Sequence, residues 1–544
     1  MLEQARHTLQ KCDGLPLAIS TIGGFLATMP KTDIEWKKMN DNISTELVTN
    51  PELRGIKTIL MRSYDGLPYH LKAAFLYLSI FPDDHKIRWG RLVRRWIAEG
   101  YSRDMHGMTA IELCQRYFDE LMDRSMILPG DGIDQYNRKN NSCQLHDMIR
   151  EICISKAREE NLVFTLEEGC CLSDTQGAIH NLVIGSNCKR DKDVLESMLD
   201  LSHVRSLTVF GQWRSFFISD SMRFLRVLDL EDTLELRNCH LDKIGQLRHL
   251  KYLSVRGCRR ISCLPNSLGN LSHLETLDVR GTRLNELPKT FTNLQQLQHL
   301  RGDSLFFMPQ VLDVCLNRHD LFNLYRFSGG IAKLKGLYTL GNVFVSCGNG
   351  KATVKKIGDL SQLRKLKVQG INELDSCELW SAIAGHSQLL SLSVERQSSG
   401  VLDGCLCEGL SPPISLESLT LDGELTKATE WIGKLQNLSK LVLEHSELKQ
   451  DDDAIQALGF LPNLAVLRLN TCSFEGTKLH FQSSSFLNLM VLELYVLGNL
   501  RSVLFKEGTM PRLELLHVGG CQDLNAFSGL AASPHKPQGN SVGR

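Results

Sequence analysis

Apolar residues recur along most of the chain with a period of about 24 positions, within the range of roughly 20–29 residues that stacked repeats show. The motif Leu-x-x-Leu-x-x-Leu-x-Val occurs at 247–255 and again at 271–279, and a Leu-Pro pair follows each copy. Each copy predicts a short strand whose Leu and Val side chains point inward. Because one such unit cannot bury its apolar face alone, the pattern predicts a solenoid of stacked coils.

The repeat keeps its phase from residue 207 to residue 516, which indicates a leucine-rich repeat array. Thirteen leucines open the expected strands: Leu207, Leu228, Leu253, Leu277, Leu300, Leu340, Leu366, Leu392, Leu419, Leu441, Leu467, Leu492 and Leu516. The interval from Leu300 to Leu340 exceeds the others and contains Phe306 and Phe307. It is either a degenerate coil or an insertion that offers aromatic side chains to a partner. Either interpretation predicts a change of curvature there.

The first 165 residues lack this repeat and read as helices. Apolar positions predict helices around 92–97, 110–121 and 148–159, and residues 126–128 and 143–145 are candidates for a two-stranded wing. The expected fold class is α/β multidomain: a helical fragment and a winged-helix domain, followed by a leucine-rich repeat horseshoe. The expected domains are residues 1–55 (helical), 56–165 (winged helix), 166–530 (repeats) and 531–544 (disordered tail).

Composition narrows the function classes. Lys plus Arg and Asp plus Glu both number 62, so no global field favours nucleic acid, and no nucleic-acid partner is expected. The 17 Cys show no paired framework and predict free, buried thiols in a reducing compartment. The sequence shows no secretory signal and no apolar run long enough for a membrane span, so a cytoplasmic location is expected.

Four motifs carry a family resemblance. Residues 14–18 read GLPLA, 75–84 read FLYLSIFPDD, 96–101 read WIAEGY and 145–147 read LHD. In this order, followed by the repeats, they resemble plant nucleotide-binding leucine-rich repeat disease resistance proteins (NB-ARC/LRR) of the coiled-coil class. The resemblance implies an innate immune receptor, not an enzyme, that recognises a pathogen effector or a guarded host protein through its repeats. It also implies autoinhibition, with possible contacts to an NB-ARC core.

The family begins with a coiled coil and a nucleotide-binding core, and neither is found in this sequence. The family's P-loop, G-x-x-x-x-G-K-[ST], which cradles phosphate and Mg²⁺, does not occur in the sequence. The chain therefore resembles the carboxy-terminal portion of such a receptor, and we expect it to retain neither ADP nor ATP, the cofactors of the full-length family. The alternative function is a repeat adaptor or scaffold without a nucleotide switch, such as a ubiquitin-ligase substrate receptor.

Individual residues follow from these arguments. By resemblance, Pro16 would pack against adenine and His146 would lie near the β-phosphate of ADP, although a helix-start proline and a half-buried histidine at a helix entry are the alternatives. Asp147 is expected to cap the helix that follows it. The basic run Arg88, Arg91, Arg94 and Arg95 is expected on a solvated face or at an interdomain contact. The residues expected to bind a partner on the concave strand face are Tyr252, Arg256, Asp278, Arg280, Lys365, Lys367, Arg468, Glu493 and Tyr495.

Overall fold

The chain divides into two compact units. Unit 1 comprises 1–135, 139–235 and 247–253, and unit 2 comprises 136–138, 236–246 and 254–544. The computed structural model describes residues 2–12, 19, 22–23, 26, 30, 32–41, 54–83, 85–104, 107–130, 142–166, 179–186, 200–214, 218, 221–284, 287–302, 331–345, 350–396, 401–403, 406, 409–426, 431–449 and 454–529.

Unit 1 begins with helices and a small sheet. Its α-helices are α1 (Leu2–Cys12), α3 (Asp33–Asp41), α5 (Arg54–Asp65), α6 (Tyr69–Leu76), α7 (Trp89–Glu99), α8 (Ala110–Asp123) and α9 (Asp147–Glu159). The 3₁₀ helix η2 (Tyr77–Ile80) continues α6, and Phe81-Pro82 follows it. The strands are β1 (Ile87–Arg88), β2 (Leu128–Pro129) and β3 (Ser142–Gln144), and both β1 and β2 pair with β3 antiparallel. The predicted winged helix is therefore present, with three strands instead of the expected two.

A single apolar core holds these helices together. Phe75, Leu92, Trp96, Phe118 and Cys153 are fully or almost fully buried in it. The apolar positions of α7 and α8 follow the helical spacing that the sequence showed, so each helix buries one face against its neighbours. A capping box at Thr109 begins α8, where the Thr109 hydroxyl accepts from Glu112 N and the Glu112 carboxylate accepts from Thr109 N.

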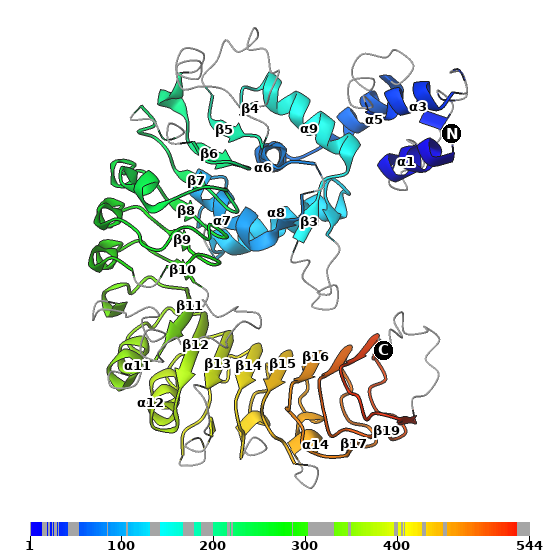
Figure 1. Cartoon of the computed structure of the whole chain (residues 1–544), viewed down its shortest axis with the longest axis vertical. Helices are drawn as coiled ribbons and strands as arrows, with labels where there is room; N and C mark the ends of the chain where they lie inside the picture. Colours follow the sequence, from blue (N-terminus) through cyan, green and yellow to red (C-terminus); the bar gives the residue numbers. More distant parts are fainter. Residues whose placement is uncertain are drawn as a thin grey trace, which may run out of the picture. The chain divides into compact units, whose positions relative to one another are not determined.

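The first coils of the repeat array also belong to unit 1. Their strands run parallel in chain order: β4 (Val163–Leu166), β5 (Asn181–Ile184), β6 (Ser206–Val209), β7 (Val227–Asp229) and β8 (Tyr252–Ser254). Leu182 pairs with Leu207, and Leu207 pairs with Leu228. The sequence missed β4 and β5, and β4 begins inside the segment that it assigned to the winged helix. Figure 1 shows α7 beside β7 and β8.

The strands of unit 2 continue the same pattern. They are β9 (Thr276–Asp278), β10 (His299–Arg301), β11 (Thr339–Phe344), β12 (Lys365–Ile371), β13 (Ser391–Arg396), β14 (Ser418–Asp422), β15 (Lys440–Glu444), β16 (Val466–Asn470), β18 (Val491–Tyr495) and β20 (Leu515–Gly519). All thirteen predicted leucines fall within strands. Leu300 pairs directly with Leu340, so the long interval leaves the strand register unbroken. Its residues 303–330 lie outside the described part of the chain, and the predicted change of curvature stays a prediction.

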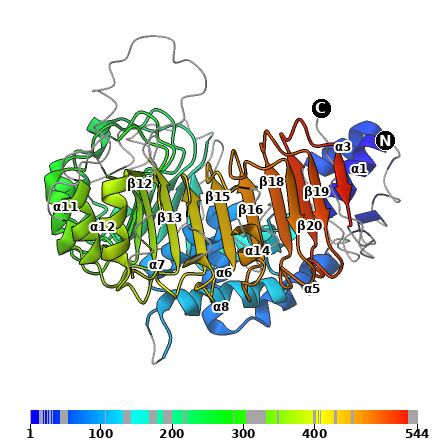
Figure 2. The same ribbon diagram turned by 90° about the horizontal axis from the view of Figure 1, so that it is seen from below.

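Helices and a second ladder complete the coils of unit 2. The helices are α11 (Gly350–Gly358), α12 (Glu373–Ile383), α14 (Ala454–Leu458) and the 3₁₀ segments η5 (Asn238–Leu241), η6 (Ile244–Gln246), η7 (Asn266–Asn270), η8 (Lys289–Asn293) and η10 (Ile331–Lys333), and unit 1 adds η4 (Leu201–His203). Figures 1 and 2 show α11 and α12 together on one side of β11–β13. A second parallel ladder, β17 (Lys478–Phe481), β19 (Ser502–Phe505) and β21 (Ala526–Ser528), was not predicted.

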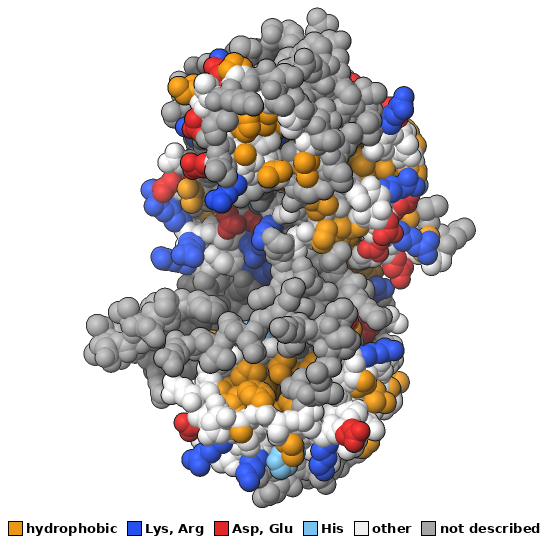
Figure 3. Space-filling view, turned by 90° about the vertical axis from the view of Figure 1, so that its right-hand side faces the viewer, with side chains coloured by type: hydrophobic (Ala, Val, Ile, Leu, Met, Phe, Trp, Pro, Cys, Tyr) orange, Lys and Arg blue, Asp and Glu red, His pale blue; other side chains and the backbone are white. Residues whose placement is uncertain are grey.

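The last coil differs from the others in burial. Residues of β20 are only half-buried and those of β21 are exposed, whereas Leu467 and Leu492 in earlier strands are fully buried. Figure 3 shows hydrophobic side chains on both the upper and the lower half of the face that it draws. No helix in the described part of the chain is long and apolar enough to cross a membrane.

The cysteines correct part of the sequence analysis. Cys258 forms no disulfide and is buried as expected, but Cys239, Cys263 and Cys472, which also form no disulfide, are exposed. Cys377, in α12, is in a disulfide. Position within a repeat therefore did not predict the burial of these cysteines.

Candidate functional site

A buried cluster of charges joins the winged helix to the first coils of unit 1. Arg95 donates from Nη1 to Asp229 Oδ2 at 2.6 Å, and Arg91 donates from Nε to the same oxygen at 2.8 Å. Both arginines come from α7, and Asp229 ends β7. Relative exposure is 4% for Arg91 and 0% for Arg95 and Asp229, so this charge cluster is closed to solvent. Of the alternatives for the arginines of α7, the interdomain contact is confirmed for these two.

The local sequence explains why both arginines reach one carboxylate. Arg91 and Arg95 are four positions apart, and side chains at that spacing lie on the same face of a helix. Leu92 and Trp96 occupy a different face and bury it in the helical core. Gly100 ends the helix with a φ of 90°, where its N–H donates to Trp96 O at 3.1 Å and Ile97 O at 3.0 Å.

Further hydrogen bonds occupy other donors of Arg95. Its Nε donates to the Tyr77 hydroxyl at 2.9 Å, and its Nη2 donates to Thr208 Oγ1 at 2.7 Å. The guanidinium carbon also lies 5.2 Å from the ring centroid of Tyr77. Arg88 extends the charge cluster to the surface through an ion pair with Glu231. A buried charge with this many partners is fixed in position, which is the condition for a buried ion pair to be tolerated.

Neighbouring charges in this cluster shift one another's pKa values. Burial alone would raise the pKa of Asp229, but the positive charges of Arg91 and Arg95 outweigh it and leave that pKa below its usual value. Burial lowers the pKa of His85 to about 4, and the charges of Arg91 and Arg88 contribute. His85 is therefore neutral at physiological pH, and its Nε2 lies 3.2 Å from Arg91 Nη1.

Glu99 is a second buried carboxyl on α7. It is 8% exposed, and burial raises its pKa from 4.5 to about 7, although Arg95 and Arg226 oppose the shift. The adjacent main chain is also held, because Arg226 donates from Nη1 to Glu99 O at 3.0 Å. A carboxyl that titrates near neutral pH in this contact couples the packing of α7 to proton concentration.

Tyr252 corrects the expected recognition face. The sequence placed it among the partner-binding residues, but it is only 1% exposed and packs with Ala98 of α7 and Val227 of β7. The alternation rule assigned its face of the strand correctly, but could not show that the winged helix covers that face. Tyr252 is therefore part of the winged-helix contact and unavailable to a partner.

His146 takes the capping role that was expected of Asp147. His146 is the N-cap of α9, and its Nδ1 accepts from Met148 N at 3.2 Å. Asp147 is the first residue of the helix, where its negative charge is favourable beside the helix N-terminus. The expected cap at Asp147 is wrong by one position, because a histidine with an unprotonated Nδ1 can accept this hydrogen bond. Pro16 lies outside the described residues, so the adenine contact stays a prediction.

The strands of unit 2 align their outward residues in rows across the open face, which we call the strand face (β12–β18). One row, by register, is Lys367, Ser393, Thr420, Val442, Arg468 and Glu493. Arg468 and Glu493 form an ion pair at 2.7 Å within it. Lys365 is exposed and Lys367 half-buried, whereas Tyr495 is 50% exposed. A Cβ on Gly519 would meet the Tyr495 ring at 2.9 Å, so glycine allows this ring to lie over the next strand.

The next row is acidic. Glu395, Asp422 and Glu444 pair in register on β13, β14 and β15, and we call them the acidic row. Strands in a sheet lie about 4.8 Å apart, so three like charges follow one another at close spacing. Burial raises the pKa of Glu395, and the charges of Asp422 and Glu444 add to the shift. Sequence analysis missed this row, because only the strand register places these residues side by side.

The neighbours of the acidic row are mostly neutral. Gln369 donates to Glu395 from one side, and Asn470 Nδ2 donates to Glu444 Oε1 at 3.0 Å from the other. His445 Nδ1 lies 2.8 Å from Asp422 Oδ1. These contacts orient the carboxylates without fully neutralising them.

Three of the expected partner-binding residues lie on earlier coils of unit 2. Arg280 holds Asp278 in two hydrogen bonds, at 2.6 and 2.9 Å, and Arg301 contacts the same carboxylate at 3.3 Å. Asp278 is only 3% exposed, so its carboxylate binds these arginines and is closed to a partner. Arg256 and Arg280 are half-buried.

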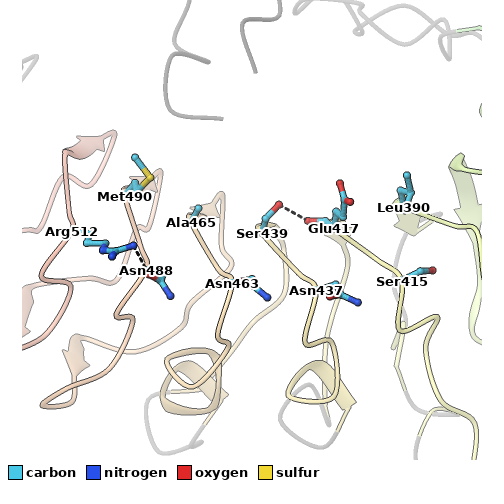
Figure 4. Close-up of a pocket in the computed structure, with 10 residues that line it drawn as sticks. All are labelled: Leu390, Ser415, Glu417, Asn437, Ser439, Asn463, Ala465, Asn488, Met490 and Arg512. Atoms are coloured by element: carbon cyan, nitrogen blue, oxygen red, sulfur yellow. Dashed lines mark hydrogen bonds between the residues drawn. The ribbon is translucent and has the colours of Figure 1, made fainter. Parts of the chain in front are cut away.

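A polar groove of about 770 Å³ runs along the turns that precede the strands of unit 2 (Figure 4). Asparagines at equivalent positions of successive coils line it. Asn437 donates to Ile414 O at 3.1 Å, Asn463 to Gln436 O at 2.8 Å and Asn488 to Pro462 O at 2.7 Å. Figure 4 also shows Arg512 bonded to Asn488. These amides hydrogen-bond each coil to the one before it. The asparagines that line the groove are therefore explained by their role in stabilising the repeats.

Comparison with known proteins matches the repeats and the winged helix separately. Residues 203–531 match the family model "Leucine-rich repeat region", and residues 80–153 match "Disease resistance protein Winged helix domain". The chain is 32% identical to "Disease resistance protein PIK6-NP" of Oryza sativa subsp. japonica, over 83% of this chain and 45% of that protein. It is 29% identical to "Probable disease resistance RPP8-like protein 2" of Arabidopsis thaliana, over 94% of this chain and 55% of that protein.

A third relative also matches most of this chain and about half of its own length. "Disease resistance protein RPM1" of Arabidopsis thaliana is 27% identical over 96% of this chain and 54% of its own length. The chain therefore spans about half the length of the curated relatives it matches.

Proposed function

We propose that this chain, which belongs to the plant leucine-rich repeat disease resistance proteins, acts in defence by binding a protein partner on its strand face. The partner is a pathogen protein or a host protein that a pathogen alters, and the binding takes place in the cytoplasm. The observation that carries the proposal is the register of the strand face, which presents the acidic row beside Lys367 and Arg468.

The acidic row supports a partner with a basic segment. Like charges on neighbouring strands destabilise a sheet, so Glu395, Asp422 and Glu444 oppose folding where they stand. Lysine or arginine side chains of a partner would relieve that repulsion on binding. The exposed ring of Tyr495 offers a large contact surface at the far side of the same face.

The charge cluster of unit 1 supports an autoinhibitory role for the winged-helix contact. Arg91, Arg95 and Asp229 fix α7 to β7 through partners that solvent does not reach. Separating the two would expose three charges and Tyr252 together, which makes the contact an all-or-none element. We assign it the role of holding the winged helix against the first coils until a signal releases it. Nothing among the described residues favours the alternative of a ubiquitin-ligase adaptor.

A binding experiment on the whole chain tests the proposal. The acidic-row variant carries Glu395→Gln, Asp422→Asn and Glu444→Gln. We expect it to bind a fluorescent lysine-rich peptide about tenfold more weakly than the unmodified chain, a loss of about 1.4 kcal/mol. The matched control removes three carboxylates elsewhere in unit 2, by Glu373→Gln, Glu475→Gln and Glu507→Gln, and should bind as the unmodified chain does.

Proximity labelling in leaf cells then tests the biological part. With the whole chain as bait, at least one host or pathogen protein should lose its labelling with the acidic-row variant and keep it with the control. If both variants label the same proteins as the unmodified chain, the strand face is not the recognition surface.

A further inference from the structure

A second surface of unit 2 gathers arginines from three successive coils. Arg237, Arg259, Arg260 and Arg283 line a pocket of about 550 Å³, together with Asn238, Cys239 and Ser262. We call this the arginine pocket. All four arginines are exposed, and among the described residues no carboxylate lines the pocket. It lies on the turns that follow the strands of the early coils, away from the strand face of β12–β18.

Hydrogen bonds between coils hold these turns side by side. Asn238 Oδ1 accepts from Ser262 N at 3.0 Å, and Asn238 Nδ2 donates to Ser262 Oγ at 2.9 Å. On the next coil, Arg283 N donates to Ile261 O at 2.8 Å. The backbone that carries the arginines is therefore fixed across all three coils.

Buried neighbours turn the arginine side chains outward. Leu236 precedes Arg237 and is 1% exposed, and Cys258 precedes Arg259 and is 2% exposed. Leu284 follows Arg283 and is fully buried. Because these anchors point into the coil, the arginines between them must point into solvent.

The arrangement works against folding. Positive charges on adjacent coils repel one another, and coils are separated by the strand spacing of about 4.8 Å. A solvated surface needs no such concentration of one sign, and the whole chain is electrically balanced, with 62 basic and 62 acidic residues. A ligand that brings negative charge into the pocket would offset the repulsion.

We propose that the arginine pocket binds a small anion that carries several phosphate groups. Guanidinium groups form paired hydrogen bonds with phosphate oxygens, and several forks converging on one pocket match clustered phosphates. The volume lies in the range of roughly 300–1,000 Å³ that small-molecule sites occupy. No aromatic side chain lines the pocket among the described residues, so charge rather than a base is recognised. Inorganic polyphosphate and a phosphorylated sugar share this chemistry.

Calorimetry on the whole chain tests this inference, with tripolyphosphate and fructose 1,6-bisphosphate as separate probes. The pocket variant carries Arg237→Gln, Arg259→Gln and Arg283→Gln. The control variant removes three exposed arginines elsewhere, by Arg223→Gln, Arg248→Gln and Arg501→Gln. At about 0.15 M salt, where distant charges are screened, we expect the pocket variant to bind tripolyphosphate at least about tenfold more weakly and the control to bind it unchanged.

The outcomes separate the possible ligands. Stronger binding of the sugar bisphosphate than of tripolyphosphate would point to an organic phosphate and still support the site. Equal weakening in the pocket and control variants, no binding of either probe, or preference for a hexaglutamate peptide would overturn the proposal. The acidic-row variant should bind these anions normally, so failure here and failure of the proposed function can be told apart. A thermal unfolding temperature of the pocket variant at or above that of the unmodified chain, expected because repelling exposed charges are removed, confirms that it is folded.

Discussion

Arg95 Nη1 lies 2.6 Å from Asp229 Oδ2, although the two residues are 134 positions apart in the sequence. The contact joins a helix of the winged helix to the end of a repeat strand and is fully buried at both ends. Leaving one partner of such a pair alone is far more costly than the pair is stabilising. The two elements are therefore expected to open together or not at all.

The cap of α9 gives a prediction that reverses the order expected from sequence. His146→Leu removes the acceptor for Met148 N and should lower the free energy of unfolding by about 0.5–2 kcal/mol. Asp147→Ala removes only a favourable charge in the first turn, worth about 0.3–1 kcal/mol. His146→Asn restores an acceptor and should recover part of the loss. Urea denaturation measures all three, and a larger loss for Asp147→Ala would restore Asp147 as the cap.

Glu99 predicts a pH dependence of stability. The pKa of Glu99 is about 7 in the folded chain and 4.5 in the unfolded chain. Between these pH values, the folded chain holds a proton that the unfolded chain has lost. The stability that this proton supplies is complete below pH 4.5 and disappears as pH rises through about 7. Glu99→Gln should therefore stabilise the chain relative to the unmodified protein by roughly 3 kcal/mol more at pH 8 than at pH 4.

His85 makes the comparison with the variant necessary. Its pKa of about 4 lies below 6.5, so the stability it contributes is present above pH 6.5 and is lost as pH falls toward 4. This trend has the opposite sign to that of Glu99 and partly masks it in the unmodified chain. A difference between the Glu99→Gln variant and the unmodified chain that does not change with pH would show that folding leaves the pKa of Glu99 unshifted.

The repeat architecture predicts a local response to core damage. Leu277 is fully buried in β9, so Leu277→Ala should lower the free energy of unfolding by about 2–5 kcal/mol. Each coil contacts only its neighbours, so hydrogen exchange should rise in β9 and β10 and stay unchanged in α8. Leu487→Ala is the control, because Leu487 is 53% exposed and should change stability by less than about 0.5 kcal/mol. Uniform loosening of the whole chain would contradict a solenoid.

Nucleotide content is a separate prediction. The phosphate-binding loop of the family does not occur in this sequence, so we expect the purified chain to carry no stoichiometric ADP or ATP. The protein is denatured, and the supernatant is assayed by ion-exchange chromatography. One ADP per chain, lost in His146→Leu, would make His146 a nucleotide ligand after all.

The repeats could be predicted from sequence because their signal is local and periodic. The motif that contains Leu253 and Leu277 predicts each strand, its inward face and its neighbouring strands. The structure confirms these predictions. β4 and β5 were missed because Phe164 and Leu182, which pair in the ladder, stand outside the leucine motif.

The site was less predictable because it depends on pairs distant in sequence. The spacing of Arg91 and Arg95 indicated a shared helix face, but nothing in the sequence pointed to Asp229. Tyr252 was assigned to the correct side of its strand and to the wrong surroundings, because alternation does not reveal which domain packs on a sheet. The family resemblance drawn from the winged-helix motifs, by contrast, is confirmed by the match over residues 80–153.

Hydrogen exchange on Asp229→Asn tests most directly whether the winged helix and the first coils form one cooperative element. The substitution removes the carboxylate that Arg91 and Arg95 share, leaves Arg91 only Glu231 at 3.5 Å, and should cost about 3–5 kcal/mol. Asp278→Asn is the control, since Asp278 also holds two arginines but lies in unit 2. For Asp229→Asn, we predict faster exchange in α7 and in β6–β8 together, with β14–β18 unchanged. Faster exchange in α7 while β6 and β7 keep their protection would contradict the account.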